Sequence, residues 1–296
     1  MDLIYDAIRN LLQNGAQNGW LPEIFKYGFV VNSMICAMII GPILGAVGTI
    51  VVVRRMAFFS SSIGNAAITG IALGILFGEP VSAPYASLTA FALLFALYLN
   101  FSRNKTGMSQ DTLIAVFLSA SIAIGAALMF SVTRKINIHI LDSFLFGSIL
   151  TAGYSDITML VISGGTAIVL GTVFFNRLMI SGLAPDLAEV RGVRVMAINY
   201  MFVVLLALVT VASIKIVGAI LVEALLIIPA ASARNICRSL RGFVIWSVIF
   251  GTIAAAAGVI LPIQFNISVP SGGAIIICAT AIFMMTFMFR LALRRA

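Results

Sequence analysis

Long apolar runs separated by short polar stretches dominate the chain from about residue 29 to its end. An α-helix needs roughly 20 apolar residues to cross a hydrocarbon layer about 30 Å thick. Nine runs approach this length, at residues 29–53, 57–77, 84–101, 111–131, 155–175, 196–214, 216–233, 243–261 and 272–290. The pattern predicts an all-α, polytopic bundle of transmembrane helices with nine spans, eight or ten being the alternatives.

The first 25 residues have a different pattern. Leu3, Ile4, Ile8, Leu11 and Leu12 are interleaved with charged and amide residues, at the spacing of an amphipathic helix. This segment is too polar to cross a membrane, and it lacks the apolar core and cleavage site of a signal peptide. We therefore expect an interfacial helix over residues 1–25 and a transmembrane domain over residues 26–296.

The composition excludes a soluble protein. Hydrophobic residues make up 61% of the chain and charged residues only 9%, whereas soluble domains are about half apolar and a quarter charged. So few charged side chains cannot cover a water-exposed surface.

Basic residues exceed acidic ones, 18 to 10, and their positions predict the orientation. If the C-terminus is cytoplasmic, Arg9, Lys26, Arg134, Lys135 and Lys215 fall outside and the other 13 of 18 fall inside. Those 13 are Arg54, Arg55, Arg103, Lys105, Arg177, Arg191, Arg194, Arg234, Arg238, Arg241, Arg290, Arg294 and Arg295. This asymmetry follows the positive-inside rule, so the net charge orients the chain and does not indicate nucleic-acid binding.

Two connections between spans are long. Residues 132–154, on the outer side, contain His139 and Asp142, and they are expected to form a lid or a re-entrant turn. Residues 177–195, on the cytoplasmic side, are predicted to contain a short helix that Pro185 opens and Gly192 closes.

The residues for enzymatic chemistry are missing from the sequence. The chain has a single histidine, no GxxxxGK[ST] motif, and three cysteines without CxxC spacing. We therefore expect a transport subunit without a cofactor of its own. If ATP drives transport, a partner chain must bind the ATP and Mg²⁺.

Glu223 is an acidic residue in the middle of the apolar run IVGAILVEALLIIPAASA. A charged carboxylate there costs at least about 2.5 kcal/mol, so such residues are usually functional. Pro229 cannot donate to the carbonyl of Leu225, which leaves an acceptor close to Glu223. Glu223 either faces a substrate path or is a neutral or paired carboxyl group that stabilises helix packing.

Ser61, Asn65 and Thr69 occupy one helical face at the start of the second span. Such a face must meet protein or water. These side chains either line a permeation path or hydrogen-bond between helices.

Four segments together resemble the integral permease subunits of ABC importers for zinc, manganese and iron. They are VVVRRMAFFSSSIGNAAITGIALG (51–74), DTLIAVFLSASIAIGAALM (111–129), LFGSIL (145–150) and IVGAILVEALLIIPAASA (216–233). RRMAFF and ALLIIPAA are the most specific parts, and the resemblance extends over nearly the whole chain.

The resemblance implies a second permease copy in a homodimer or heterodimer, two cytoplasmic ATPase subunits and an extracytoplasmic solute-binding protein. The segment PDLAEVRGV is similar to the family's coupling segment, which docks on the ATPase. Its expected contact residues are Asp186, Leu187, Glu189 and Gly192. The bacterial inner, or plasma, membrane is the expected location.

One departure from the family concerns the metal path. Members carry an Asp and a His four residues apart in the RRMAFF helix, where this chain has Ser61 and Asn65. Hydroxyl and amide oxygens are poor ligands for Zn²⁺. Either Glu223 supplies the carboxylate, a second permease brings the missing ligands, or the substrate is no longer a bare divalent ion.

The leading hypothesis is an ABC permease for zinc, manganese or iron whose path is lined by Ser61, Asn65, Thr69 and Glu223. The alternatives are a secondary transporter in which Glu223 carries protons, an ABC permease with another substrate, and a membrane scaffold that does not transport.

Overall fold

The computed structural model describes residues 23–80, 85–133, 154–265 and 269–295, together with residues 13, 147 and 149. These residues form helices and connecting turns, and no strand occurs among them. A single 3-10 turn, η1 (Glu23–Lys26), precedes the first long helix. The predicted interfacial helix and most of the outer connection 132–154 lie outside the described residues, so both remain predictions.

Nine long helices follow, and each coincides with one predicted span. They are α2 (Gly28–Val53), α3 (Ala57–Leu76), α4 (Tyr85–Thr106), α5 (Gln110–Thr133), α7 (Tyr154–Val173), α10 (Val195–Val217), α11 (Ala219–Ile236), α12 (Leu240–Gln264) and α13 (Ser271–Arg295). Eight have apolar stretches of 18 residues or more; in α5 the described apolar stretch is Thr112–Leu128. The all-α polytopic fold is confirmed.

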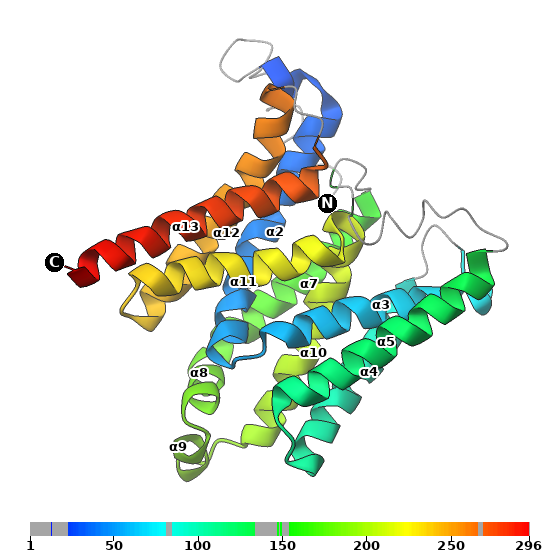
Figure 1. Cartoon of the computed structure of the whole chain (residues 1–296), viewed down its shortest axis with the longest axis vertical. Coiled ribbons are helices and arrows are strands. Elements are labelled where there is room, and N and C mark those ends of the chain that lie inside the picture. Colours follow the sequence, from blue (N-terminus) through cyan, green and yellow to red (C-terminus); the bar gives the residue numbers. More distant parts are fainter. Residues whose placement is uncertain are drawn as a thin grey trace.

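The connection from α7 to α10 contains more helix than the sequence pattern predicted. The short helix α9 (Pro185–Val190) begins at Pro185 as expected, but α8 (Phe175–Leu183) precedes it. Leu178 and Met179 of α8 are buried, so α8 packs against the bundle. Figure 1 shows α8 and α9 projecting beyond the ends of the long helices.

Helix α2 packs closely against α12 and α11 because glycines line its contact surface. A Cβ atom on Gly41 or Gly45 would come within 2.8 Å of the backbone of α12, and one on Gly48 would collide with Leu226 of α11. Ser247 of α12 donates a hydrogen bond to the carbonyl of Gly45 over 2.6 Å. Small residues of this kind allow helix backbones to approach each other in a membrane.

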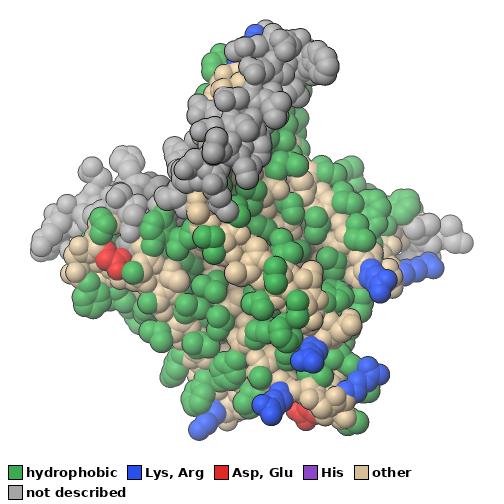
Figure 2. Space-filling model, turned by 180° about the vertical axis from the view of Figure 1, so that it is seen from behind, with side chains coloured by type: hydrophobic (Ala, Val, Ile, Leu, Met, Phe, Trp, Pro, Cys, Tyr) green, Lys and Arg blue, Asp and Glu red, His purple; other side chains and the backbone are tan. Residues whose placement is uncertain are grey.

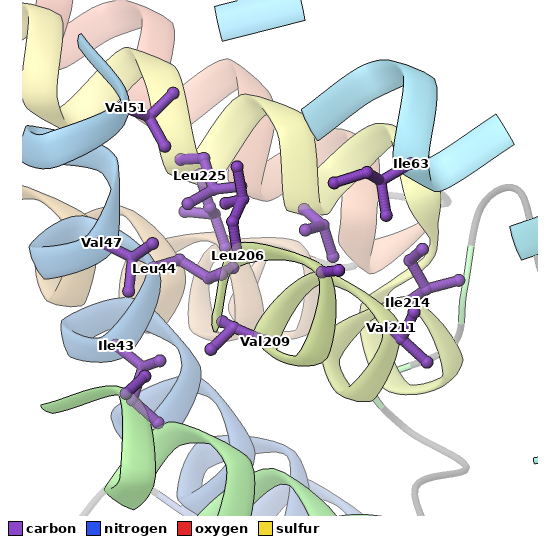
Figure 3. Close-up of a cluster of buried hydrophobic side chains, with 14 of the residues drawn as sticks. Ile43, Leu44, Val47, Val51, Ile63, Leu206, Val209, Val211, Ile214 and Leu225 are labelled. Atoms are coloured by element: carbon purple, nitrogen blue, oxygen red, sulfur yellow. The ribbon is translucent and has the colours of Figure 1, made fainter. Parts of the chain in front are cut away.

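The main core lies where α2, α10, α11 and α3 meet. Figure 3 shows Leu44 and Val47 of α2, Leu206 of α10 and Leu225 of α11 directed toward one another, and all four are buried. Helices α3, α4 and α5 pack beside this core, and α13 packs on the far side of α11 and α12.

Lys and Arg side chains lie along the lower and right-hand edges of the face in Figure 2, whereas hydrophobic side chains cover its middle. The end of α2 that carries Arg54 and Arg55 contacts α8, and α10, which follows Arg191 and Arg194, contacts both α8 and α9. This distribution agrees with the predicted separation of basic residues on one side of the membrane.

Candidate functional site

Helix α11 follows α10 after a single residue, Gly218. This glycine has φ +82°, a left-handed conformation that favours glycine, and its N–H donates to the carbonyl of Ile214 over 2.7 Å. The tight turn lays α11 against α3, α2 and α13. It therefore determines where Glu223 lies in the bundle.

Glu223 of α11 and Ser61 of α3 lie together. The Ser61 side chain lies beside the Glu223 carboxyl group, although 162 positions separate the two residues in the sequence. Both side chains are half-buried. Two residues that were selected separately from the sequence thus form one polar site.

Asn65 extends this site by one helical turn. Its Nδ2 donates to the carbonyl oxygen of Ser61 over 3.0 Å, and the side chain is half-buried. The bond uses the amide nitrogen, so the amide oxygen is still available as an acceptor. Ser61, Asn65 and Glu223 together offer hydroxyl, amide and carboxylate oxygen atoms.

Thr69 has a different environment from Ser61 and Asn65. It is fully buried, and its hydroxyl donates to the carbonyl of Ser121 in α5 over 2.9 Å. Gly125 of α5 lies against the same side chain. These contacts agree with the alternative that Thr69 hydrogen-bonds between helices. A role for Thr69 in lining a path stays a prediction.

Oxygen donors of this kind would hold a cation only weakly. In the parts of the chain that the structure describes, no group of three His, Cys, Asp or Glu residues is close enough to hold a metal ion. The single carboxylate of Glu223 with neutral oxygen donors suits transient contact with a hard cation better than tight Zn²⁺ binding.

The predicted coupling segment is an exposed helical turn. Asp186, Leu187 and Glu189 are exposed, whereas Ala188 packs inward. Gly192 has φ +75° and donates its N–H to the carbonyl of Glu189 over 2.9 Å, which ends α9 as predicted. The sequence analysis did not select Val190, whose side chain is 87% exposed at the tip of this projection.

Arg54 attaches α8 to the bundle, a role that the sequence analysis missed. From the end of α2 it donates to Asn199 Oδ1 in α10 over 2.5 Å, to Ser181 Oγ in α8 over 2.6 Å, and to the carbonyl of Leu178 over 3.2 Å. Its guanidinium group also lies 4.9 Å from the centre of the Phe202 ring. The one signal in the sequence was that Arg54 and Arg55 directly follow a long apolar run, which indicates the end of a span but not a contact with α8.

The charge of Arg54 persists in this buried environment. Burial and the nearby charge of Arg103 lower the pKa of Arg54 to about 10. The side chain is therefore protonated at neutral pH, and its contacts are charge-assisted hydrogen bonds.

The sequence profile of a family described as the ABC 3 transport family matches residues 26–290. The chain is 30% identical to the manganese transport system membrane protein MntC of Listeria innocua, over 91% of this chain and 94% of the relative. It is 28% identical to the high-affinity zinc uptake system membrane protein ZnuB of Haemophilus influenzae, over 87% of this chain and 96% of the relative.

A solved structure, PsaBC from Streptococcus pneumoniae in complex with Fab, has a similar fold. It superposes with a TM-score of 0.77 at 29% sequence identity, over 94% of this chain and 95% of the other.

Proposed function

The chain belongs to the ABC 3 transport family as a multi-pass membrane permease subunit, and we propose that it moves a divalent transition metal ion into a bacterial cell. Manganese and zinc are the first candidate ions, because the relatives that match most of this chain are named as manganese and zinc transport proteins. Iron is the third ion to be tested.

The contact between Ser61 and Glu223 carries this proposal. It places a carboxylate and a hydroxyl oxygen on facing helices, with the Asn65 amide one turn away. A transport path must release its ion as readily as it takes it up, so weak oxygen ligands are compatible with metal passage. They also fit Mn²⁺, a harder ion, better than Zn²⁺.

We propose that a second permease copy completes the path. On one chain Ser61, Asn65 and Glu223 are only half-buried, and a paired copy facing them would double the number of oxygen ligands. The second copy is either the same chain or a different permease that brings an additional carboxylate or imidazole.

The exposed α9 helix suits docking to an ATPase subunit, which would bind the ATP and Mg²⁺ that drive transport. Movement of α8 and α9 would reach the bundle through the Arg54 bonds to Ser181 and Asn199. Helix α3, with Ser61, begins three residues after Arg54, and α10 leads directly into α11, with Glu223. Closure of the ATPases would therefore act on both helices of the polar site.

This proposal replaces the proton-coupled alternative, since the family is one of ABC transporters. A solute-binding protein on the outer side would deliver the ion. The assembly would lie in the bacterial inner, or plasma, membrane with α9 in the cytoplasm, as the basic residues along that end indicate.

Reconstitution tests the proposal directly. The permease, its ATPase and its binding protein are placed in proteoliposomes, and uptake of Mn²⁺, Zn²⁺ and Fe²⁺ is measured in competition with and without ATP. We expect saturable, ATP-dependent uptake of one of these ions. Uptake that proceeds without the ATPase, or no uptake of any of the three ions, would contradict the proposal.

A further inference from the structure

A basic pocket at the end of the bundle that bears α8 has no role in the proposed path. It has a volume of about 440 Å³ and lies between the end of α2, the end of α8 and the connection from α11 to α12. Four arginines line it, namely Arg54, Arg55, Arg234 and Arg238. Such a concentration of positive charge in one cavity requires an anionic partner.

The described part of the chain does not supply that partner. Arg54 is nine-tenths buried, and its Nε has no hydrogen-bond acceptor among the described residues. The acceptors of its other N–H groups are neutral oxygens, and none of the four arginines forms an ion pair with a carboxylate among the described residues. Among the side chains that line the pocket, Arg54 therefore keeps one buried donor, its Nε–H, without an acceptor in the described residues.

The backbone around the pocket also suits an anion. Ser239 lines the pocket and caps the N-terminus of α12, where its hydroxyl accepts the N–H of Gly242 over 3.2 Å. The positive end of the α12 dipole therefore faces the same cavity. Arg55 adopts φ +55°, a left-handed conformation unusual for a residue other than glycine and one that is often found at functional positions.

The position in the membrane indicates the kind of anion. The pocket lies where the α2 span ends and the α12 span begins, and the ends of spans are where lipid headgroups are expected. The exposed side chains of Leu183 and Leu240 line the pocket as well.

We propose that this pocket binds the phosphate headgroup of an anionic phospholipid, whose acyl chains contact the exposed side chains of Leu183 and Leu240. Basic pockets between transmembrane helices at the cytoplasmic leaflet are suited to such headgroups. An acidic protein surface would satisfy the arginines but not the adjoining apolar side chains, so a lipid fits the pocket better. The inference does not depend on which ion the permease transports.

Native mass spectrometry of the delipidated, full-length permease in detergent tests this site. Phosphatidylglycerol is titrated against phosphatidylcholine with the same acyl chains. We expect one phosphatidylglycerol to bind per chain with an affinity at least about tenfold higher than that of phosphatidylcholine. Equal affinity for the two lipids would overturn the proposal.

A variant with Arg55→Gln, Arg234→Gln and Arg238→Gln removes three pocket charges and leaves Arg54 in place. We expect it to lose the preference for phosphatidylglycerol. The matched control is Arg177→Gln with Arg191→Gln and Arg194→Gln, three arginines that line a separate cavity beside α10. If the control loses the preference equally, general surface charge and not this pocket binds the lipid.

Cys237 provides a second measurement that needs no arginine substitution. Its thiol lines the pocket, and burial raises its pKa, so it reacts slowly with maleimide at neutral pH. In a Cys278→Ser background, phosphatidylglycerol should slow this labelling further, whereas phosphatidylcholine should not. Equal protection by both lipids, or by inorganic phosphate alone at the same concentration, would show that the pocket does not select an anionic lipid.

Discussion

The side chain of Ser61 in α3 lies beside the carboxyl group of Glu223 in α11, at the contact between these two helices. Neither helix could place this site alone. The short turn at residues 54–56 positions the start of α3, and Gly218 positions the start of α11. The two polar residues meet because both helices pack around the same part of the bundle.

Glu223→Gln should lower ATP-dependent metal uptake by at least about tenfold. The amide keeps the size of the side chain and can still contact Ser61, but it cannot supply the negative charge that attracts a divalent ion. Uptake in proteoliposomes at several metal concentrations measures the change. Thermal unfolding should be unaffected or slightly improved, because a buried charge is removed.

Ser62→Ala is the matched control for Ser61→Ala. Ser62 is buried and donates only to the carbonyl of Phe58 in its own helix, whereas Ser61 contacts Glu223. We expect Ser61→Ala to reduce uptake severalfold and Ser62→Ala to leave it near the wild-type level. Equal losses would remove the Ser61–Glu223 pair from the path.

Ser61→Asp with Asn65→His should strengthen metal binding and slow transport. The two changes introduce the carboxylate and imidazole that the family resemblance implies at these positions, beside the existing carboxylate of Glu223. Imidazole and carboxylate ligands raise affinity for Zn²⁺ in particular, and a tighter site releases its ion more slowly.

Elemental analysis of the purified double variant should detect retained zinc, and its maximal uptake rate should fall. Asn65→Gln serves as the control, because it keeps the amide and adds no strong ligand. If the double variant retains no more metal than the control does, Ser61 and Asn65 do not face the ion.

The sequence predicted the nine helices because a membrane imposes a length and an apolar composition on each span separately. It also predicted that Ser61 and Asn65 share a face, since this follows from the helical period alone. The sequence also predicted the start of α9 at Pro185 and its end near Gly192, because proline and glycine determine helix ends locally. All three predictions agree with the structure.

Features that depend on which helices become neighbours were less predictable. The period placed Thr69 on the same face as Asn65, but α5 covers Thr69 in the structure. Arg54 and Arg55 appeared equivalent as topology signals, yet Arg54 is buried among α2, α8 and α10 and Arg55 is exposed. Such differences arise from packing between distant segments, which periodicity does not encode.

Thr69→Val should lower stability by about 1 kcal/mol or less, because it removes one interhelical hydrogen bond and preserves the shape of the side chain. Metal uptake should persist at close to the wild-type rate. Thermal unfolding of the purified permease measures the first effect and proteoliposome uptake the second. Thr252→Val is the control, since Thr252 donates to Val248 within its own helix; a large loss of uptake without loss of stability would instead place Thr69 in the path.

Arg54→Lys should weaken the link between ATP hydrolysis and transport. Lysine keeps the charge, but its single ammonium group cannot reproduce the planar set of donors that Asn199, Ser181 and Leu178 accept. We expect hydrolysis by the assembled transporter to continue while uptake per ATP falls severalfold.

Arg290→Lys is the corresponding control, since Arg290 is exposed and donates only to Asn235 over 3.1 Å. It should leave the ratio of uptake to hydrolysis unchanged. An equal effect of the two substitutions would show that Arg54 does not transmit motion from α8.

Asp186→Lys with Glu189→Lys should disrupt docking of the ATPase on α9. Both side chains are exposed on a helix whose fold depends on Pro185, the buried Ala188 and Gly192, so the reversal of charge changes the surface without removing a packing contact. Binding of the ATPase, measured by co-purification, should weaken by roughly tenfold or more, and uptake should fall with it.

The neutral pair Asp186→Asn with Glu189→Gln should give an intermediate loss if charge is the cause. Val190→Asp should weaken docking if the exposed end of α9 enters the ATPase. Normal co-purification and normal uptake by the charge-reversed variant would show that the coupling surface lies elsewhere on the cytoplasmic side.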